Sequence, residues 1–318
     1  MPIPFGDDVS AVEIQGGGKL AILKTDMLIG KTDVPHGMSL SQAARKAVVM
    51  NISDLAAKGV TPIALLVSIG VPNNLSKKDV EQIGTGLNSG AREYGAYILG
   101  GDTSEASDLV ISCAVFGIGE KKCIMLRSGA EPDDIVAVTG FFGKTASGLE
   151  ILLQNLSVPS GTRKALVNSV LMPHARLTEG LTLAMTDAVT ASIDSSDGLA
   201  WSLHEISKAS HVGFIIENLP IAEEAKQFAK MQKLDSNELC LYGGEEYELV
   251  VTVKPDLWKK ASEKVPLIKI GHATKKKTLT LKVGGKAIPI EARGWEHFKT
   301  KRSNVMKHEV KPFSAKIL

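Results

Sequence analysis

The sequence has few cysteines and almost no excess of charge, and both shortages limit what the protein can be. Its three cysteines, Cys113, Cys123 and Cys240, are widely spaced and form no Cys-x-x-Cys pair. This argues against a disulfide framework and against a structural zinc site. The formal net charge is only +2, from 37 basic and 35 acidic residues. So balanced a chain has no strong field to attract nucleic acid or an anionic membrane, and we expect it to bind neither.

Long apolar segments are also missing. No run of 18 apolar residues occurs, as a membrane-spanning helix would require. The first residues, Met-Pro-Ile-Pro-Phe-Gly-Asp-Asp, form neither a basic nor an apolar signal region. We therefore expect a cytoplasmic protein. With 318 residues, 44% of them hydrophobic and 23% charged, the chain has the composition of a globular protein with room for two domains.

The common nucleotide and hydrolase motifs are absent as well. A Walker A loop needs a glycine five residues before its Gly-Lys-Ser/Thr, and the two candidates, at Gly30 and Gly143, have Thr25 and Val138 there. No Gly-x-Gly-x-x-Gly follows a predicted strand, which excludes Rossmann and protein-kinase loops. The segment 194–198 lacks the ligand spacing of an EF-hand. No His-Glu-x-x-His or Gly-x-Ser-x-Gly occurs either.

What the chain does have is a set of six short acidic motifs beside glycine or at the end of a predicted element. They are Gly6-Asp7-Asp8, Thr25-Asp26, Asn51-Ile52-Ser53-Asp54, Gly100-Gly101-Asp102, Ile193-Asp194-Ser195-Ser196-Asp197-Gly198 and Gly243-Gly244-Glu245-Glu246-Tyr247. Any one alone is ordinary turn chemistry. Glycine, however, lets backbone approach a ligand closely, and carboxylates are the oxygen ligands that magnesium prefers. If they converge, each like-charged pair near 4 Å costs about 4 kcal/mol at an effective dielectric near 20. Divalent cations offset that repulsion, so the motifs predict a magnesium–polyphosphate site built from distant segments.

Strand and helix signals alternate along both halves of the chain. We predict strands at residues 19–29, 63–69, 97–99, 109–117, 135–139, 213–216, 248–253 and 266–271, a hairpin around Gly284-Gly285, and helices at 39–58, 77–93, 145–154, 222–231 and after Gly198. The turn-rich segment 127–134 separates the halves. We therefore predict an α/β or α+β fold with two domains, residues 1–126 and 127–318.

The helix at 39–58 carries one of the acidic motifs. Ser39 and Gln42 have capping-box spacing, and Gly59 ends the helix. Its predicted buried face consists of Ala44, Ala47, Val48, Ile52 and Leu55. Asp54 lies on another face and has two interpretations. It is either a ligand of the predicted metal site or the partner of Lys58 in an i,i+4 ion pair worth a few tenths of a kcal/mol.

Taken in order, the motifs resemble those of a known family. Gly-Asp-Asp, Lys-Ala-Val-x-x-Asn-x-Ser-Asp-Leu-Ala-Ala, Gly-Gly-Asp-Thr, Arg-Ser-Gly-Ala-x-Pro, Asp-x-Ser-Asp-Gly-Leu and Gly-Gly-Glu-x-Tyr-Glu-Leu all occur here in one sequence. Together they are similar to thiamine-monophosphate kinases, within the superfamily that includes aminoimidazole ribonucleotide synthetase and selenophosphate synthetase. The last of these motifs and the terminal segment from Gly294-Trp295 to Phe298 favour the kinase among its relatives.

The resemblance implies ATP-dependent phosphorylation of thiamine phosphate to thiamine diphosphate, with magnesium. It further implies a fold like that of aminoimidazole ribonucleotide synthetase, with a mostly antiparallel N-terminal sheet and a homodimer formed through the N-terminal half. By position in the motifs, the implied magnesium ligands are Asp8, Thr25, Asp26, Asp54, Asp102, Asp194 and Asp197. The implied ATP contacts are Gly101, Asp102, Arg127 and Ser196. Glu245 and Trp295 are implied to contact thiamine phosphate.

Two departures from the family pattern leave questions open. Asp33 stands where bacterial members carry a substrate-binding histidine, so either Asp33 or the nearby His36 takes that place. The chain also begins almost at Gly6-Asp7-Asp8, without the N-terminal helical segment usual in the family. Asp7 itself is either a ligand or a turn residue, and Glu246 competes with Glu245 for the ligand. The alternatives to the kinase are another ATP-dependent synthetase of the superfamily and a catalytically silent nucleotide-binding dimer.

Overall fold

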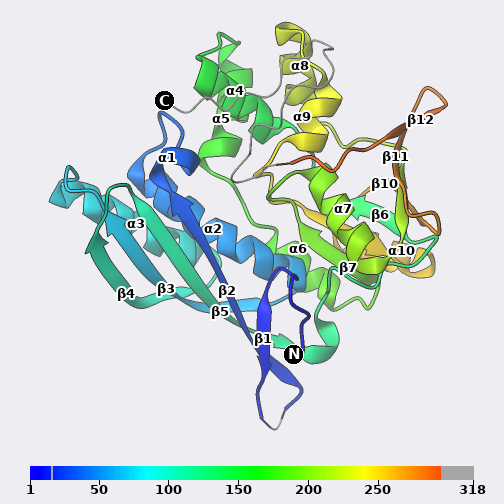
Figure 1. Ribbon diagram of the computed structural model, residues 1–318, viewed down its shortest axis with the longest axis horizontal. Coiled ribbons are helices and arrows are strands. Elements are labelled where there is room, and N and C mark those ends of the chain that lie inside the picture. Colours follow the sequence, from blue (N-terminus) through cyan, green and yellow to red (C-terminus); the bar gives the residue numbers. More distant parts are fainter. Residues whose placement is uncertain (16, 295–318) are drawn as a thin grey trace, which may run out of the picture.

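The computed structural model describes residues 1–15 and 17–294, in which two β-sheets each carry helices (Figure 1). The N-terminal sheet has the strand order β1-β2-β5-β3-β4. Its strands are β1 (Ser10–Glu13), β2 (Lys19–Ile29), β3 (Thr61–Val71), β4 (Tyr97–Glu105) and β5 (Val110–Glu120). All neighbours pair antiparallel except β3 and β4. The expectation of a mostly antiparallel N-terminal sheet is confirmed.

Three helices belong to this half: α1 (Gly30–Asp33), α2 (Leu40–Lys58) and α3 (Lys77–Glu93). The capping box of α2 forms as predicted. Ser39 Oγ accepts the N–H of Gln42 at 3.2 Å, and the Gln42 side chain accepts the N–H of Ser39 at 2.9 Å. Gly59 then ends the helix with a φ of 66°, a left-handed conformation that favours glycine. The sequence therefore fixes both ends of α2 locally.

The C-terminal half holds a seven-stranded sheet in the order β12-β11-β8-β10-β6-β9-β7. Its strands are β6 (Ile135–Val138), β7 (Val189–Asp194), β8 (Gly213–Ile216), β9 (Leu249–Val253), β10 (Ile268–Thr274), β11 (Leu279–Val283) and β12 (Lys286–Pro289). Its helices are α4 (Lys144–Gln154), α5 (Ser160–Leu171), α6 (Leu177–Ala184), α7 (Leu199–Ser210), α8 (Glu223–Gln232), α9 (Ser236–Tyr242) and α10 (Trp258–Lys264). Short 3-10 turns occur at Lys121–Cys123 and Pro255–Leu257.

Helix α2 lies between the two halves and is buried on nearly every side. In Figure 1 it runs from behind the N-terminal sheet to α6, and one apolar core joins residues on α2 and β2 to residues on β9. Asn51, Asp54 and Lys58 are buried along with the predicted apolar face. The alternative of an Asp54–Lys58 ion pair is wrong, since Lys58 pairs with Asp7 and Asp8 instead. The boundary predicted between residues 126 and 127 falls in a loop and stays a prediction.

The remaining predicted elements form with modest changes of length, and several elements were not predicted. The strand predicted at 97–99 continues to Glu105, so Gly100-Gly101-Asp102 lies within β4 rather than after it. Strands β1 and β7 and helices α5, α6 and α9 were missed. Helix α5 has only two buried residues, Leu166 and Val170, which is too few for a periodic signal. Among the described residues, no helix combines the length and apolar character needed to cross a bilayer.

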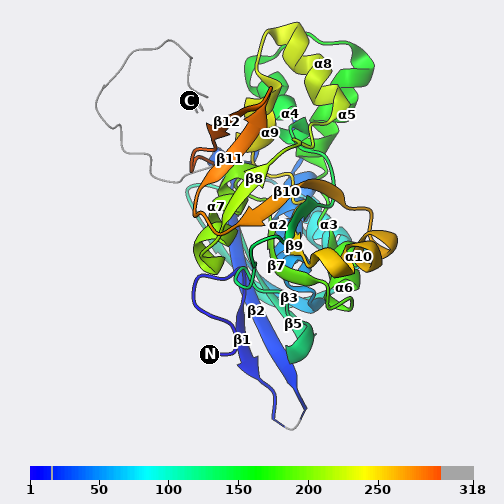
Figure 2. The ribbon, with the colours of Figure 1, turned by 90° about the vertical axis from the view of Figure 1, so that its right-hand side faces the viewer.

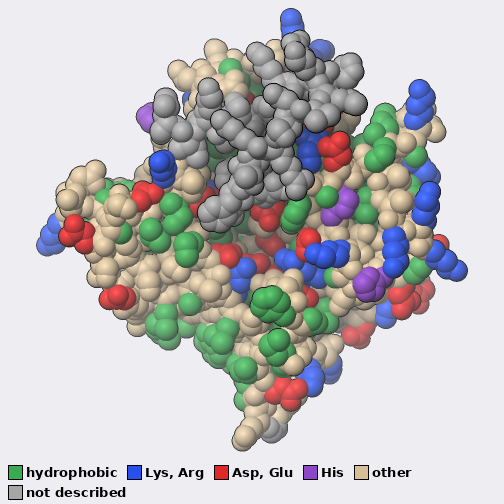
Figure 3. All heavy atoms as spheres, in the orientation of Figure 1, with side chains coloured by type: hydrophobic (Ala, Val, Ile, Leu, Met, Phe, Trp, Pro, Cys, Tyr) green, Lys and Arg blue, Asp and Glu red, His purple; other side chains and the backbone are tan. Residues whose placement is uncertain are grey.

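The face of the N-terminal sheet that points away from α2 is open. Along β2 and β3 the side chains alternate between this open face and the core. Leu66 is 56% exposed, Leu99 72% and Met27 56%. Figure 3 shows hydrophobic side chains distributed over this part of the molecule, and Figure 2 shows the β1–β2 hairpin projecting beyond it. The sheet thus has an apolar face without a covering layer in the described chain.

Candidate functional site

Three buried carboxylates from distant segments converge between the two sheets. Asp8 lies in the loop before β1, Asp54 in the last turns of α2, and Asp194 at the end of β7. One oxygen of each lies within 4.8 Å of the others. Acidic and basic side chains gather near the centre of Figure 3, where the N-terminal sheet meets the C-terminal half. The structure thus brings together three of the predicted ligands, one from each of three motifs.

Asp8 is the best compensated of the three. Lys58 Nζ lies 2.7 Å from Asp8 Oδ2, and Arg127 Nε donates to Asp8 Oδ1 at 2.7 Å. Burial alone would raise the pKa of Asp8, but the charges of Lys58 and Arg127 together hold it below its usual value. Asp7 also binds the chain itself, because its Oδ1 lies 2.8 Å from Lys58 Nζ and its Oδ2 accepts the N–H of Arg127 at 3.0 Å. Both oxygens of Asp7 therefore have structural partners.

Asp54 and Asp194 have less positive charge near them. Ser53 Oγ donates to Asp194 Oδ2 at 2.7 Å, and Lys24 Nζ lies 3.1 Å from Asp54 Oδ2. Burial, followed by the charge of Asp8, raises the pKa of Asp194 to about 7. Burial and the charge of Asp194 raise the pKa of Asp54 despite Lys24. Carboxylates this close cannot all ionise without further positive charge. A divalent cation that prefers oxygen ligands fits this donor set.

Thr25 and Asp26 are neighbours in sequence but lie on opposite faces of β2. Thr25 is exposed on the open face, whereas Asp26 points toward α2, as expected for successive strand residues. Asp26 Oδ1 lies 3.1 Å from Lys24 Nζ, and its N–H donates to the side-chain oxygen of Asn51 at 2.9 Å. The structure therefore keeps the Thr25 hydroxyl away from the buried carboxylates.

The Gly-Gly-Asp motif has a structural explanation that the sequence did not show. In β4, Gly101 pairs with Val67, and a Cβ at Gly101 would lie 1.7 Å from the Val67 carbonyl oxygen. Only glycine allows the two strands to come this close. Asp102 pairs with Ser68 and is exposed on the open face. The structure thus separates Asp102 from the group formed by Asp8, Asp54 and Asp194.

Lys46 contacts two of the predicted substrate residues, Glu245 and Asp33. It is 1% exposed, its Nζ lies 2.5 Å from Glu245 Oε1, and it donates to the carbonyl oxygen of Asp33 at 3.0 Å. The N–H of Glu245 donates to the carbonyl oxygen of Ser196 at 2.6 Å. Glu245 also has a φ of 62°, which is uncommon for a residue with a side chain. Lys46 thereby links Asp33 to Glu245, and the backbone of Glu245 is in turn bonded to Ser196.

The two residues considered for the family's histidine differ in their surroundings. Asp33 is half-buried and its carboxylate accepts the N–H of Ile29 at 2.7 Å, whereas His36 is exposed. Trp295 lies outside the described residues. Just before it, a Cβ at Gly294 would lie 2.4 Å from the carbonyl oxygen of Asp197. The backbone leading to Trp295 therefore lies against the motif that contains Asp194 and Asp197.

The Gly143-Lys144-Thr145 segment begins helix α4, and a carboxylate from the chain itself occupies its N-terminus. Glu246 Oε1 accepts the N–H of Thr145 at 3.1 Å. Burial raises the pKa of Glu246 to about 7, against the effect of this backbone hydrogen bond. Since a helix N-terminus is the usual place for a phosphate, Glu246 fills the position that a phosphate would take. This agrees with the absence of a Walker A loop and separates the structural Glu246 from Glu245.

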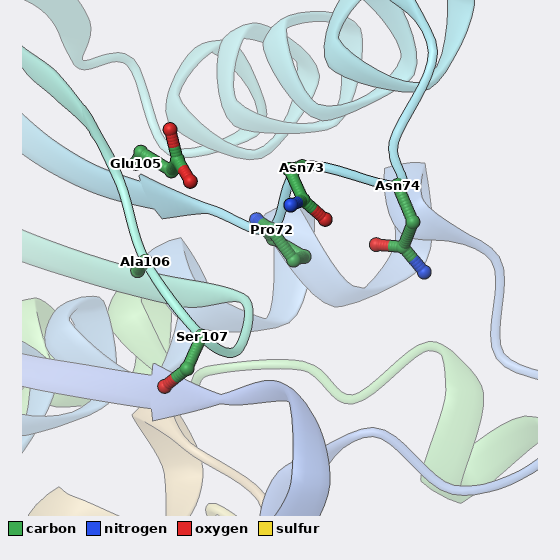
Figure 4. Close-up of a pocket in the computed structure, with 6 residues that line it drawn as sticks. All are labelled: Pro72, Asn73, Asn74, Glu105, Ala106 and Ser107. Carbon is green, nitrogen blue, oxygen red and sulfur yellow. The ribbon is translucent and has the colours of Figure 1, made fainter.

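An open hollow of about 660 Å³ lies at the ends of β3 and β4 (Figure 4). Its lining consists of Pro72, Asn73 and Asn74 after β3, facing Glu105, Ala106 and Ser107 at the end of β4. None of these residues is basic and one is acidic. The hollow is therefore poorly suited to a polyphosphate.

Sequence reasoning missed the basic partners of the carboxylates. Lys24, Lys46 and Lys58 each bind a carboxylate of the site, and the exposure of their side chains is 20%, 1% and 0%. Lysine is rarely buried unless it is paired, so each would be assigned to the surface from sequence alone. The available signal was position, because Lys24 lies two residues before Asp26 and Lys58 lies four residues after Asp54.

Comparison with known proteins agrees with this architecture. Family models for the AIR synthase related protein match residues 6–119 with its N-terminal domain and residues 131–284 with its C-terminal domain. The thiamine-monophosphate kinase of Nitrosopumilus maritimus is 39% identical over 283 residues, 87% of this chain and 89% of that protein. That of Pyrococcus horikoshii is 35% identical over 297 residues, 93% of this chain and 91% of that protein.

Solved structures extend the comparison to three dimensions. A structure described as AaThiL complexed with AMPPCP and TMP superposes with a TM-score of 0.84 at 28% identity, covering 92% of both chains. Thiamine monophosphate kinase from Aquifex aeolicus gives a TM-score of 0.79 at 27% identity, covering 88% of this chain and 92% of that one. The resemblance first seen in the six motifs is thus confirmed along nearly the whole chain. The chain belongs to the thiamine-monophosphate kinase family of AIR synthase related proteins.

Proposed function

We propose that this protein uses ATP to phosphorylate thiamine phosphate, which yields thiamine diphosphate and ADP. Relatives named thiamine-monophosphate kinase extend over most of the chain, and the similar AaThiL structure holds AMPPCP and TMP together. The observation that carries the proposal is the convergence of Asp8, Asp54 and Asp194 in this same fold. Phosphoryl transfer depends mainly on positioning and on positive charge at the phosphates, and such carboxylates hold the cation that supplies this charge. A cytoplasmic location remains the expectation from the sequence.

Magnesium is the cation that we propose for the three carboxylates. They are hard oxygen donors, and the raised pKa values of Asp54 and Asp194 reflect the positive charge that the protein alone does not provide. When bound, magnesium neutralises negative charge on the phosphates of ATP. The further ligands implied by the family resemblance, Thr25, Asp26, Asp102 and Asp197, stay predictions.

Arg127 is the residue that we propose to contact a phosphate of ATP. Its side chain is 22% exposed and is held beside the three carboxylates by Asp8 and by Glu205, whose Oε2 lies 3.4 Å from an Arg127 nitrogen. Asp8, Glu205 and the Gly6 carbonyl oxygen together accept four of the five N–H groups of this guanidinium. The remaining Nη2 N–H and the positive charge are what Arg127 can offer to a phosphate. The other predicted ATP contacts, Gly101, Asp102 and Ser196, stay predictions.

The transfer is proposed to be direct. The bond between the γ-phosphorus and the bridging oxygen of ATP breaks, and a phosphate oxygen of the substrate forms the new bond. This oxygen is already anionic near neutral pH, so no general base is required. A phosphoenzyme would need a nucleophile such as histidine. Two histidines have structural partners instead: His174 contacts Glu93, and His204 lies 2.9 Å from the carbonyl oxygen of Ile290. Incubation with labelled ATP and no acceptor should leave the denatured protein unlabelled, and a labelled chain would contradict direct transfer.

We also propose a homodimer in which a second copy covers the open face of the N-terminal sheet. Support comes from the exposed Met27, Leu66 and Leu99 on this face, since apolar patches of this kind mark association surfaces. Light scattering should give about twice the chain mass of 33.8 kDa. Leu66→Lys should shift the protein toward the monomer. A monomer of wild-type protein at micromolar concentration would refute the proposal.

The activity is tested by ADP formation with thiamine phosphate, thiamine and formylglycinamidine ribonucleotide as separate acceptors. Turnover should require magnesium and thiamine phosphate. Asp54→Asn keeps the size of the side chain but removes a charge from the buried carboxylates, so turnover should fall by orders of magnitude while the fold persists. Asp79→Asn is the matched control, because Asp79 is a capping residue of α3 and does not belong to the group of three buried carboxylates. Near-wild-type turnover of Asp54→Asn would contradict the metal assignment, and turnover with another acceptor alone would favour another synthetase.

Asp33, Glu245 and Trp295 are proposed to form the site for thiamine phosphate. The permanent positive charge of the thiazolium can stack on an indole face, a contact worth about 1–2 kcal/mol. Trp295→Ala should therefore raise the KM for thiamine phosphate about five- to thirtyfold and leave that for ATP almost unchanged. An equal effect on both substrates would assign Trp295 to packing instead.

A further inference from the structure

We infer that Lys24 is a built-in cation that takes the place of a metal ion between Asp26 and Asp54. This inference deepens the proposed function, since it rests on the proposed metal site at Asp8, Asp54 and Asp194. Lys24 Nζ lies 3.1 Å from Asp26 Oδ1 and 3.1 Å from Asp54 Oδ2. One ammonium group thus bridges two carboxylates that come from different segments of the chain.

The position of Lys24 in β2 is unusual for a lysine. Side chains at 20, 22, 24, 26 and 28 share the face of β2 that packs toward α2, and Leu20, Ile22 and Leu28 on this face are all buried. Across the sheet, Lys24 pairs with Val115, which is fully buried. An ammonium group on an apolar face is costly unless carboxylates compensate it. The cost of desolvation alone would exclude a lysine from this position. The two carboxylate partners of Lys24 offset that cost and so explain why a lysine is found here.

The distribution of cations over the carboxylates shows which part of the site Lys24 serves. Asp8 has Lys58 and Arg127 as partners, whereas Asp194 receives a hydrogen bond from Ser53. Lys24 supplies the ion-pair partner shown for Asp26 and Asp54. Its charge is covalently attached and therefore present at every magnesium concentration. Asp26 and Asp54 are thus compensated permanently on one side, which leaves the Asp54–Asp194 side for a divalent ion.

Replacing Lys24 by a short neutral residue should open this bridging position to a metal ion. The metal-free wild-type protein, titrated with Mn²⁺ and followed by electron paramagnetic resonance of the free ion, should bind one ion per chain tightly. Lys24→Thr should bind two, because the vacated carboxylate pair attracts a second divalent ion. Lys24→Arg keeps the charge and should still bind one. This readout measures binding and does not depend on turnover.

Asp26→Asn is a second, nearly isosteric test that does not depend on the folding of Lys24→Thr. If Lys24 already fills the bridging position, Asp26→Asn should keep one bound Mn²⁺, and the loss of that ion would overturn the inference. Two results with Lys24→Thr would also overturn the inference. Unchanged Mn²⁺ binding would mean that Lys24 does not affect the metal site, and a single ion bound more tightly would mean that Lys24 only repels the ion at the existing site. If the wild-type protein binds no Mn²⁺ at all, the proposed metal site itself fails, and this outcome is distinct from the others.

Discussion

Lys58 is fully buried and holds two carboxylates, so its replacement by methionine should destabilise the fold strongly. The ammonium lies 2.8 Å from Asp7 Oδ1 and 2.7 Å from Asp8 Oδ2, and it donates to the carbonyl oxygen of Ser192 at 2.7 Å. The ammonium thus has three close oxygen neighbours, two of them carboxylate oxygens. Lys58→Met keeps much of the apolar length of the side chain and removes the charge together with these three interactions.

The expected cost follows from what remains unpaired. Asp8 keeps Arg127, but Asp7 keeps only backbone N–H donors, and the Ser192 carbonyl loses its donor from Lys58. Removing one partner of a buried ion pair costs about 3–5 kcal/mol. Since proteins are stable by about 5–15 kcal/mol, the variant should lose a large part of its stability. For a chain of this size we expect the Tm to fall by about 5–8 °C.

Equilibrium unfolding in denaturant, with the metal removed, measures this loss directly. Lys77→Met is the control, because the side chain of Lys77 is 92% exposed and its nearest carboxylate oxygen is 3.9 Å away, so its loss should change stability by less than about 0.5 kcal/mol. Both variants replace a lysine by methionine on a helix of the N-terminal half, and both remove one positive charge. If Lys58→Met cost under about 1 kcal/mol, burial of the carboxylates would not depend on Lys58 and the reasoning would be refuted.

Three further predictions concern packing, pH and the metal. In α3, Gly86→Ala should destabilise the fold by at least about 1–3 kcal/mol, because its Cβ would lie 2.1 Å from the Ser41 carbonyl oxygen. Gly84→Ala has nothing within 4 Å of its Cβ and should stabilise the fold by about 0.5–1 kcal/mol. The denaturant midpoints of the two variants should therefore shift in opposite directions. The pKa of Glu246 is raised to about 7, so the folded state holds a proton that the unfolded state releases above about pH 4.3, and stability from this group is lost as the pH rises from there through 7. Glu246→Gln should flatten that slope in unfolding measured from pH 4 to 8, and an unchanged slope would assign it to other groups. Calcium in place of magnesium should bind but support little turnover, since its longer and looser coordination misplaces the phosphates; equal rates with the two ions would count against this.

The sequence was sufficient where local chemistry decides the structure. The ends of α2 follow from Ser39, Gln42 and Gly59, and the structure reproduces them. Periodicity also identified five apolar residues of this helix that are buried, and it missed Ala43, Val49, Ala56 and Ala57, which are buried as well. It could not show that the polar residues are buried too, because that depends on the C-terminal half packing against the other side of α2. For the same reason the nearby Asp54 and Lys58 were a plausible pair, although both have partners far away in sequence.

For the candidate site, the sequence identified carboxylates better than their arrangement. Short acidic motifs beside glycine or at the end of a predicted element pointed to Asp8, Asp54 and Asp194, which the structure brings together. The same signal at Gly101 has a different cause, the close approach of β4 to β3. Which of Thr25 and Asp26 faces the core depends on strand register, and register is set by tertiary pairing. The compensating lysines left no motif, because their role exists only after the chain has folded.

Helix α2 has a consequence for how ligands enter. Its side chains make polar contacts with the C-terminal half along its length: Arg45 Nη1 with the Pro173 carbonyl at 2.8 Å, Lys46 with Glu245, Ser53 with Asp194, and Lys58 with the Ser192 carbonyl. A hinge opening between the halves would break all four contacts at once. The buried charged groups that make them would then be left without partners and only partly hydrated. We therefore expect the two halves to unfold in a single transition and to behave as one rigid body during turnover. Access to the carboxylates then depends on local rearrangement of loops, such as the segment 243–248, rather than on separation of the domains.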